Sequence, residues 1–93
     1  MGVATVDLYL EGVHGLKEKR GIVRRVLERT RHRFPVSVAE VDSLDLHQKA
    51  TIGFAVVSND ARLADSILNK VIDYVEELHL AEITRTDLEI LHV

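Results

Sequence analysis

The residues between Lys17 and Arg33 carry the strongest chemical signal in the sequence. This stretch holds eight of the twelve lysine and arginine residues and two glutamates, which gives it a net charge of +6, whereas the whole chain has a net charge of −3. Guanidinium groups form charge-assisted, often bidentate hydrogen bonds with phosphate. The stretch therefore indicates contact with an anionic partner, although it does not identify that partner.

Helical spacing of the apolar residues in this stretch places its cations on defined sides of a helix. The predicted helix runs from Leu16 to about Arg33, and Pro35 prevents it from continuing. Its apolar arc, at 100° per residue, consists of Ile22, Val23, Val26, Leu27 and Thr30. Four cations lie within about 60° of one another beside this arc, and two more lie on the outer side. The predicted nucleic-acid-binding residues are Lys17, Arg20, Arg24 and Arg31, assisted by Arg25 and Arg29.

A solvated or ion-paired helix surface is the alternative interpretation of the same residues. Residues 60–93 carry eight acids against three bases. If a second helix packs beside the first, Asp65, Asp73 and Glu76 would partly neutralise the cations. The sequence leaves both interpretations open.

Other groups that could do chemistry are sparse. The chain has no cysteine, so disulfides, thiolate metal sites and thiol nucleophiles are excluded. The polar segment from Asp42 to His47 contains two aspartates and a histidine, but their closeness in sequence does not define a ligand geometry, and no metal site is predicted. The remaining histidines are scattered, and no Ser-His-Asp arrangement can be argued. We therefore expect no cofactor, and the sequence favours a non-enzymatic role.

The elements that position these residues follow from hydrophobic periodicity. Alternation predicts strands, and 3.6-residue spacing predicts helices. The segment Ser58-Asn59-Asp60 is typical of a helix start. The expected elements are a strand at 3–10, a helix at 16–33, a strand at 36–42, a strand at 49–57, a helix from about 60, and a strand at 81–93.

Two details of these strands are also predicted. The second strand does not alternate cleanly, which indicates a bulge near Ala39–Glu40. In the last strand, alternation places Ile83 on the face opposite Leu88 and Ile90.

The order of elements predicts an α+β fold formed by a single domain of residues 1–93. Right-handed strand–helix–strand units close most simply into a ferredoxin-like βαββαβ sandwich. In this arrangement a four-stranded antiparallel sheet has the strand order 4-1-3-2, and both helices cover one face.

The other face of the predicted sheet is the second candidate surface. It carries a single aromatic residue and several carboxylates, a poor platform for stacking RNA bases. Small apolar residues on its central strand instead favour self-association, because an apolar patch usually needs cover. We expect a homo-oligomer whose interface includes Thr5, Tyr9, Gly53, Ala55 and Val57.

Three segments resemble the YlxP-like family of small bacterial proteins. They are Gly15-Leu16-Lys17-Glu18-Lys19-Arg20, Phe34 to Asp42 (FPVSVAEVD) and Gly53 to Asp60 (GFAVVSND). The family pattern has serine where this chain has Gly15. The resemblance implies a ferredoxin-like fold and a gene that tends to lie among translation and ribosome-maturation genes. This neighbourhood suggests a role near the ribosome. Together with the basic helix, it favours a non-enzymatic accessory factor of translation or ribosome maturation, whose partner is ribosomal RNA or a ribosome-assembly intermediate.

An enzyme interpretation rests on a second resemblance. The segment Gly12-Val13-His14-Gly15-Leu16 is similar to the phosphate loop of acylphosphatases, which share this topology, and Lys19 stands where those enzymes have an arginine. A lysine does not replace a bidentate arginine, and Asn59 and Asn69 lie in the wrong segments for the asparagine that orients water.

The sequence also bears on where the protein acts and on a further alternative. No signal peptide or membrane span is recognised, so a cytoplasmic protein is expected. The alternative to RNA contact is a protein–protein interaction or assembly module. Its basic helix would dock on an acidic protein.

Overall fold

The computed structural model describes residues 1–92. Among these residues it contains four strands and two helices in the order strand, helix, strand, strand, helix, strand. They are β1 (Gly2–Tyr9), α1 (Leu16–Arg33), β2 (Ser37–Asp42), β3 (Lys49–Val56), α2 (Ala61–Glu77) and β4 (Glu82–Ile90).

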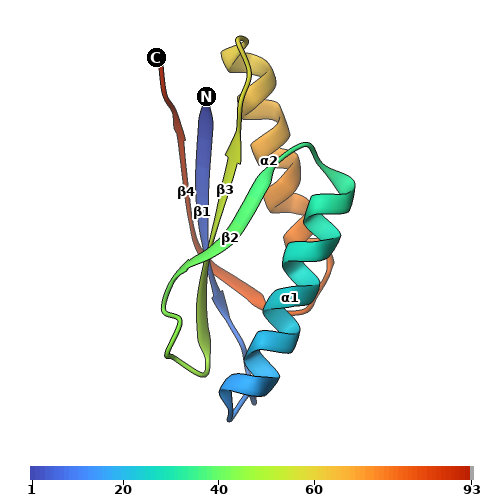
Figure 1. Cartoon of the computed structure of the whole chain (residues 1–93), viewed down its shortest axis with the longest axis vertical. Helices are drawn as coiled ribbons and strands as arrows, with labels where there is room; N and C mark the ends of the chain where they lie inside the picture. The colour runs from blue at the N-terminus through green and yellow to red at the C-terminus, as the bar shows by residue number, and fades with distance from the viewer. Residues whose placement is uncertain (93) are drawn as a thin grey trace.

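The strands form one antiparallel sheet in the order β2-β3-β1-β4. Both helices lie on the same side of this sheet, and the two ends of the chain lie close together at one end of the molecule (Figure 1). This is the predicted ferredoxin-like βαββαβ sandwich, and the prediction of fold class is confirmed. The sheet face that the helices leave uncovered is called the open face below.

The core forms between the sheet and the helices. On β1 and β3 every second residue is buried, as alternation requires when one face of a strand packs and the other does not. Helix α2 contributes four buried apolar residues at helical spacing, which are Ala64, Leu68, Val71 and Val75. Helix α1 contributes Val23 and Val26.

Helix α2 begins where the sequence predicts a helix start. Asp60 is its N-cap residue, and the Asp60 carboxylate accepts hydrogen bonds from the backbone N–H groups of Arg62 at 2.9 Å and Leu63 at 3.3 Å. Such a cap satisfies donors that the first turn of a helix leaves without partners. Among residues 1–92, neither helix is long and apolar enough to cross a membrane.

The last strand departs from the predicted alternation at its beginning. The register between β1 and β4 shifts by one residue at Thr84. As a result, Ile83 packs against the core together with Leu88 and Ile90. The prediction that Ile83 faces the opposite side was wrong, because a bulge reverses the alternation of the residues beyond it. The predicted strand also extended to Val93, which lies outside the described residues.

The edge strand β2 contains the second irregularity. Its register with β3 shifts between Glu40 and Asp42, so the extra residue is Val41, one position beyond the predicted bulge at Ala39–Glu40. The Val41 side chain is 53% exposed and lies on the open face beside Gly53. Alternation from Val38 already places Val41 on the open face, and the bulge brings the next residue, Asp42, opposite Thr51 on the same face.

Candidate nucleic-acid interface

The exposed cations of α1 form two rows on opposite flanks of its buried face. The centre of the buried face consists of Lys19, Val23, Val26 and Thr30. At 100° per residue, the members of the first row lie within about 60° of one another around the helix axis, and the members of the second row, on the opposite flank, lie within about 80° of one another. The β2-side row is Lys17, Arg20, Arg24 and Arg31, and the α2-side row is Arg25, Arg29 and Arg33. All seven residues are exposed.

The β2-side row is oriented by the edge of the sheet. The Arg31 guanidinium donates a hydrogen bond of 3.1 Å to the backbone carbonyl of Val38 in β2. This contact occupies an edge carbonyl that would otherwise be open to pairing with another strand. Arg31 is therefore partly committed to the fold, whereas no acidic side chain among residues 1–92 forms an ion pair with Lys17, Arg20 or Arg24.

The α2-side row is oriented by the contact between the two helices. The Arg33 guanidinium lies 5.4 Å from the centre of the Tyr74 ring, and Tyr74 in turn meets Phe34 edge to face at 5.4 Å. These distances suit a cation–π contact and an aromatic pair. Within the described part of the chain, neither Arg25 nor Arg29 forms an ion pair with an acid.

The acids of α2 that the sequence offered as partners for this surface lie elsewhere. At 100° per residue, Asp65 and Glu76 fall on the flank of α2 opposite Tyr74, the residue that contacts α1, and Asp73 falls on the outward side, about 100° from Tyr74. Glu76 accordingly lines a hollow beside Tyr9 of β1 and the start of β4. Among residues 1–92 no ion pair joins the two helices, so these acids do not neutralise the rows by direct contact.

Lys19 is a cation of α1 whose burial the sequence analysis did not predict. Its side chain is 1% exposed, and its Nζ lies 2.9 Å from Oε2 of Glu40 in β2. The ammonium group also donates to the backbone carbonyls of Ser43 and Leu44 in the β2–β3 connection. Lys19 thus fastens the start of α1 to β2, and its ammonium group is not available to hold the phosphate of an acylphosphatase substrate. The signal for burial was its angle, about 20° from both Val26 and Thr30.

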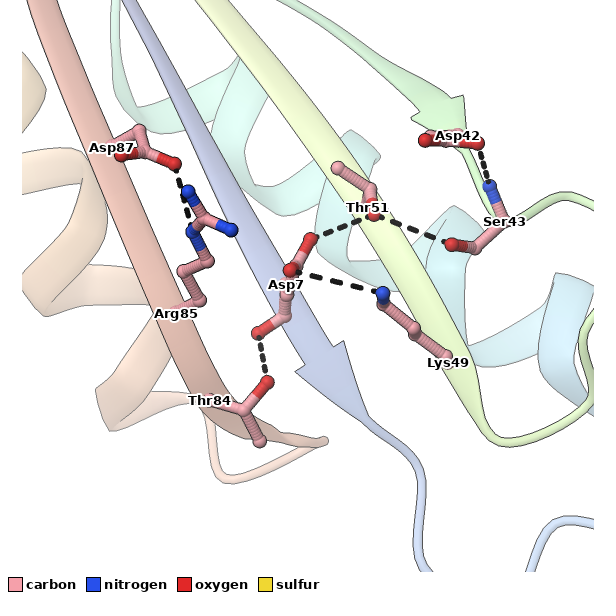
Figure 2. A network of polar contacts seen from close by, with 8 residues as sticks. All are labelled: Asp7, Asp42, Ser43, Lys49, Thr51, Thr84, Arg85 and Asp87. Carbon is pink, nitrogen blue, oxygen red and sulfur yellow. Dashed lines mark hydrogen bonds and ion pairs between the residues drawn. The ribbon is translucent and has the colours of Figure 1, made fainter.

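A polar network occupies one end of the open face. The Asp7 carboxylate accepts a hydrogen bond of 2.7 Å from the Thr51 hydroxyl and lies 3.9 Å from Nζ of Lys49 (Figure 2). The Thr51 hydroxyl also lies 3.5 Å from that of Ser43. On β4, Arg85 pairs with Asp87 at 3.1 Å. Charges of both signs are therefore mixed on this face, and they partner one another.

An apolar groove occupies the other end of the open face. It has a volume of about 520 Å³, and three of the five residues predicted at an oligomer interface line it, namely Thr5, Gly53 and Ala55. The structure adds Val3, Ala39 and Val41 to this lining. Tyr9 and Val57 lie outside the groove; Val57 follows the end of β3 and is 85% exposed.

The polar segment between β2 and β3 contains the carboxylates and the histidine that were considered as metal ligands. Asp42 accepts a hydrogen bond of 2.7 Å from the backbone N–H of Ser43, which has a left-handed φ of 62°. Asp45 and His47 line a shallow hollow together with His14. Among residues 1–92, no three histidine, aspartate or glutamate side chains come close enough to hold a metal ion.

Comparison with known proteins places these features in a family. Residues 1–88 match the family model described as "Protein of unknown function (DUF503)". The chain is also 30% identical over 89 residues to a Bacillus subtilis (strain 168) protein described as "Uncharacterized protein YlxP", and the match covers 94% of this chain and 97% of that protein.

A solved structure supports the fold alone. The structure described as "Structural Genomics, protein YJCS" superposes with a TM-score of 0.51 and covers 98% of both chains. At 12% sequence identity, this similarity supports the arrangement of strands and helices but does not assign a function.

Proposed function

Because this chain belongs to the DUF503 family of proteins of unknown function, we propose a function for it from the chemistry of its own surface. It is a non-enzymatic accessory factor of translation or ribosome maturation that contacts RNA phosphates electrostatically through α1. Its partner is ribosomal RNA or a ribosome-assembly intermediate. Phosphate contacts of this kind supply affinity and position without reading sequence.

The observation that carries the proposal is the pair of exposed cation rows on α1. Lys17, Arg20 and Arg24 on one flank and Arg25 and Arg29 on the other have no acidic partner among residues 1–92. A protein of net charge −3 that places eight of its twelve cations on one helix, together with only two acids, presents a local positive surface there. The likeness to the YlxP-like family, noted above from sequence segments, supports placing the RNA near the ribosome.

Binding to a structured fragment of ribosomal RNA across a salt series tests the proposal. The α1 triple variant replaces Lys17, Arg20 and Arg24 by Gln and leaves Arg31 in its contact with β2. The control triple variant replaces Lys49, Arg62 and Arg85 by Gln and changes net charge equally. Each phosphate contact contributes about 0.7–0.9 to the slope of log K against log salt. We expect the slope to fall by roughly 2–3 in the α1 triple variant and to stay at the wild-type value in the control.

Two results would remove this proposal. Wild-type affinity that barely changes between low and physiological salt would show that phosphate contacts do not drive binding. Equal losses in the two triple variants would show that net charge, rather than α1, governs the interaction.

A second candidate function, an assembly module, is favoured by the apolar groove on the open face. We propose that its occupant is a second copy of this chain. Among residues 1–92, no charged residue lines the groove itself, and the charges elsewhere on the open face are of both signs, with Lys49 beside Asp7 and Arg85 beside Asp87, so two copies can meet across this face with opposite charges available to pair. The cationic rows of α1, in contrast, would repel their copies.

Sedimentation equilibrium tests this second candidate. Val41 lines the groove and is more than half exposed, so Val41→Glu alters the groove without entering the core. We expect the wild type to be dimeric or larger and Val41→Glu to dissociate it, whereas the α1 triple variant keeps the wild-type mass. A monomeric wild type at about 100 μM would refute self-association through this face.

A further inference from the structure

We infer that α1 lies along the minor groove of double-stranded RNA, with each of its two cation rows contacting the phosphates of one strand. The inference rests on the proposed function and adds the class of RNA that the site takes. Four observations carry it: the separation of the rows, the residues between them, the positions of the aromatic side chains, and the way α1 is embedded in the surface.

The two rows are too far apart around the helix to follow one backbone. The β2-side row is held toward the sheet edge, as the contact from Arg31 to Val38 shows, and the α2-side row toward α2, as the contact from Arg33 to Tyr74 shows. A helix with its side chains is about 10–12 Å across. Cations on both flanks of such a helix can therefore reach the phosphates of two strands. A duplex offers this arrangement, because the phosphates of its two strands border each groove.

The outward side of α1 between the two rows, called the ridge below, does not suit contact with the phosphates of a strand. At 100° per residue, Gly21, Glu28 and His32 point most directly away from the core. A single strand running along the ridge would bring phosphates against the Glu28 carboxylate, which repels them. In a duplex groove the ridge faces base edges and 2′-hydroxyls, and a carboxylate can accept a hydrogen bond from a 2′-hydroxyl. Gly21, which has open space around it, lets the helix backbone approach closely.

The aromatic residues are placed where they cannot stack unpaired bases. Proteins that bind single strands stack successive bases on exposed aromatic side chains. This chain has four aromatic residues. Phe54 is in the core, Phe34 and Tyr74 pack on each other between the helices, and Tyr9 stands alone at one end of the open face. Recognition of a duplex through its backbone and shape needs no such platform.

The embedding of α1 favours RNA over DNA. Helix α1 packs on the sheet along its buried face and meets α2 near its C-terminal end, so it forms part of the helical side of the molecule (Figure 1). The major groove of B-DNA is about 8.5 Å deep and admits a projecting helix. The minor groove of A-form RNA is wide and shallow, displays 2′-hydroxyls, and is open to a helix that forms part of a surface.

Equilibrium binding of three probes at one ionic strength tests the inference. The probes are a 20-base-pair RNA duplex, an unstructured pyrimidine RNA strand of the same number of phosphates, and a DNA duplex of the same sequence. Two variants remove one row each: Arg20 and Arg24 to Gln, and Arg25 and Arg29 to Gln. We expect the wild type to bind the RNA duplex at least about 10-fold more tightly than either other probe, and both variants to lose about 10-fold or more on the duplex.

The outcomes separate this inference from the proposed function. Equal affinity for the single strand and the RNA duplex, or loss of duplex binding in only one row variant, would overturn the two-strand arrangement and leave RNA contact through α1 standing. Equal affinity for RNA and DNA duplexes would overturn the groove assignment. Failure of the wild type to bind either RNA, or binding that neither variant weakens, would overturn the proposed function as well.

Discussion

At the scale of single residues, Lys19 and Glu40 determine how the start of α1 sits on the sheet. The ammonium group is almost fully buried, and its charge is balanced by a carboxylate that is itself 13% exposed. Two backbone carbonyls of the β2–β3 connection accept its remaining hydrogen bonds. Both residues lie in segments that carry the resemblance to the YlxP-like family, so part of that pattern has a structural explanation. The lysine holds together three parts of the chain, so its charge is used within the fold, unlike those of the exposed cations.

Removal of one member of this pair should be strongly destabilising. Lys19→Met leaves the Glu40 carboxylate in a nearly buried place without a countercharge, and we expect the free energy of unfolding to fall by about 3 kcal/mol or more. Lys17→Met, two residues away but exposed, should change it by less than about 0.5 kcal/mol. Urea denaturation measures both. Equal, small changes in the two variants would show that the Lys19–Glu40 pair has no special role.

Thr30 gives a residue-scale prediction of the opposite sign. It is fully buried in α1, and its hydroxyl has no hydrogen-bond partner among residues 1–92. An unsatisfied buried hydroxyl is unfavourable, and valine has nearly the same shape without the hydroxyl. We expect Thr30→Val to raise the free energy of unfolding by about 1 kcal/mol in thermal or urea denaturation. A lower value would show that the hydroxyl is hydrogen-bonded in solution, for instance to a carbonyl of its own helix.

At the scale of elements, hydrophobic periodicity was sufficient to predict the order and the type of every strand and helix. Strands β1 and β3 and helix α2 are each buried on one side only. One-sided burial requires apolar residues at regular spacing, and this spacing is visible in the sequence. The position of Ile83 was not predictable in this way, because the bulge at Thr84 depends on pairing with β1 and leaves no mark in residue types. Local pattern specifies which residues need burial, and strand pairing decides which side they reach.

The candidate interface was predictable to a smaller extent. The sequence identified the exposed cations of α1 and their helical spacing, but it treated Arg25 and Arg29 as an outer supplement to one stripe. Their place on the flank that faces α2 depends on how the two helices pack, which the contact between Arg33 and Tyr74 defines. Likewise, the hydrogen bond from Arg31 to the carbonyl of Val38 could not be predicted without knowing that β2 lies beside α1.

Gly21 gives an element-scale prediction for α1. It lies in the helix interior, is exposed, and a Cβ added there meets no atom within 4 Å. Because glycine loses more backbone freedom than alanine on entering a helix, Gly21→Ala should raise the free energy of unfolding by about 0.5–1 kcal/mol. A fall in stability on thermal denaturation would contradict the helix environment described here.

At the scale of the whole molecule, cations are concentrated on α1, which also carries two acids, Glu18 and Glu28. The cations of α1 lie on the helical side, toward the β2 edge and the gap between the helices, whereas Glu76 of α2 lies toward β4 and Asp87 lies on the open face. Such a concentration lets an acidic protein present a basic surface and approach a polyanion in one orientation. In the proposed complex, the open face would remain available for a second copy while α1 contacts RNA.

Co-sedimentation with ribosomal subunits across a salt series tests the central claim, contact with RNA phosphates through α1, most directly. Wild type, the α1 triple variant and the control triple variant are compared at each salt concentration. We predict that wild type and control sediment with a subunit or an assembly intermediate at low salt and are released as salt rises, and that the α1 triple variant is released at distinctly lower salt. Sedimentation of all three proteins with the same salt dependence, or of none of them at low salt, would contradict the claim.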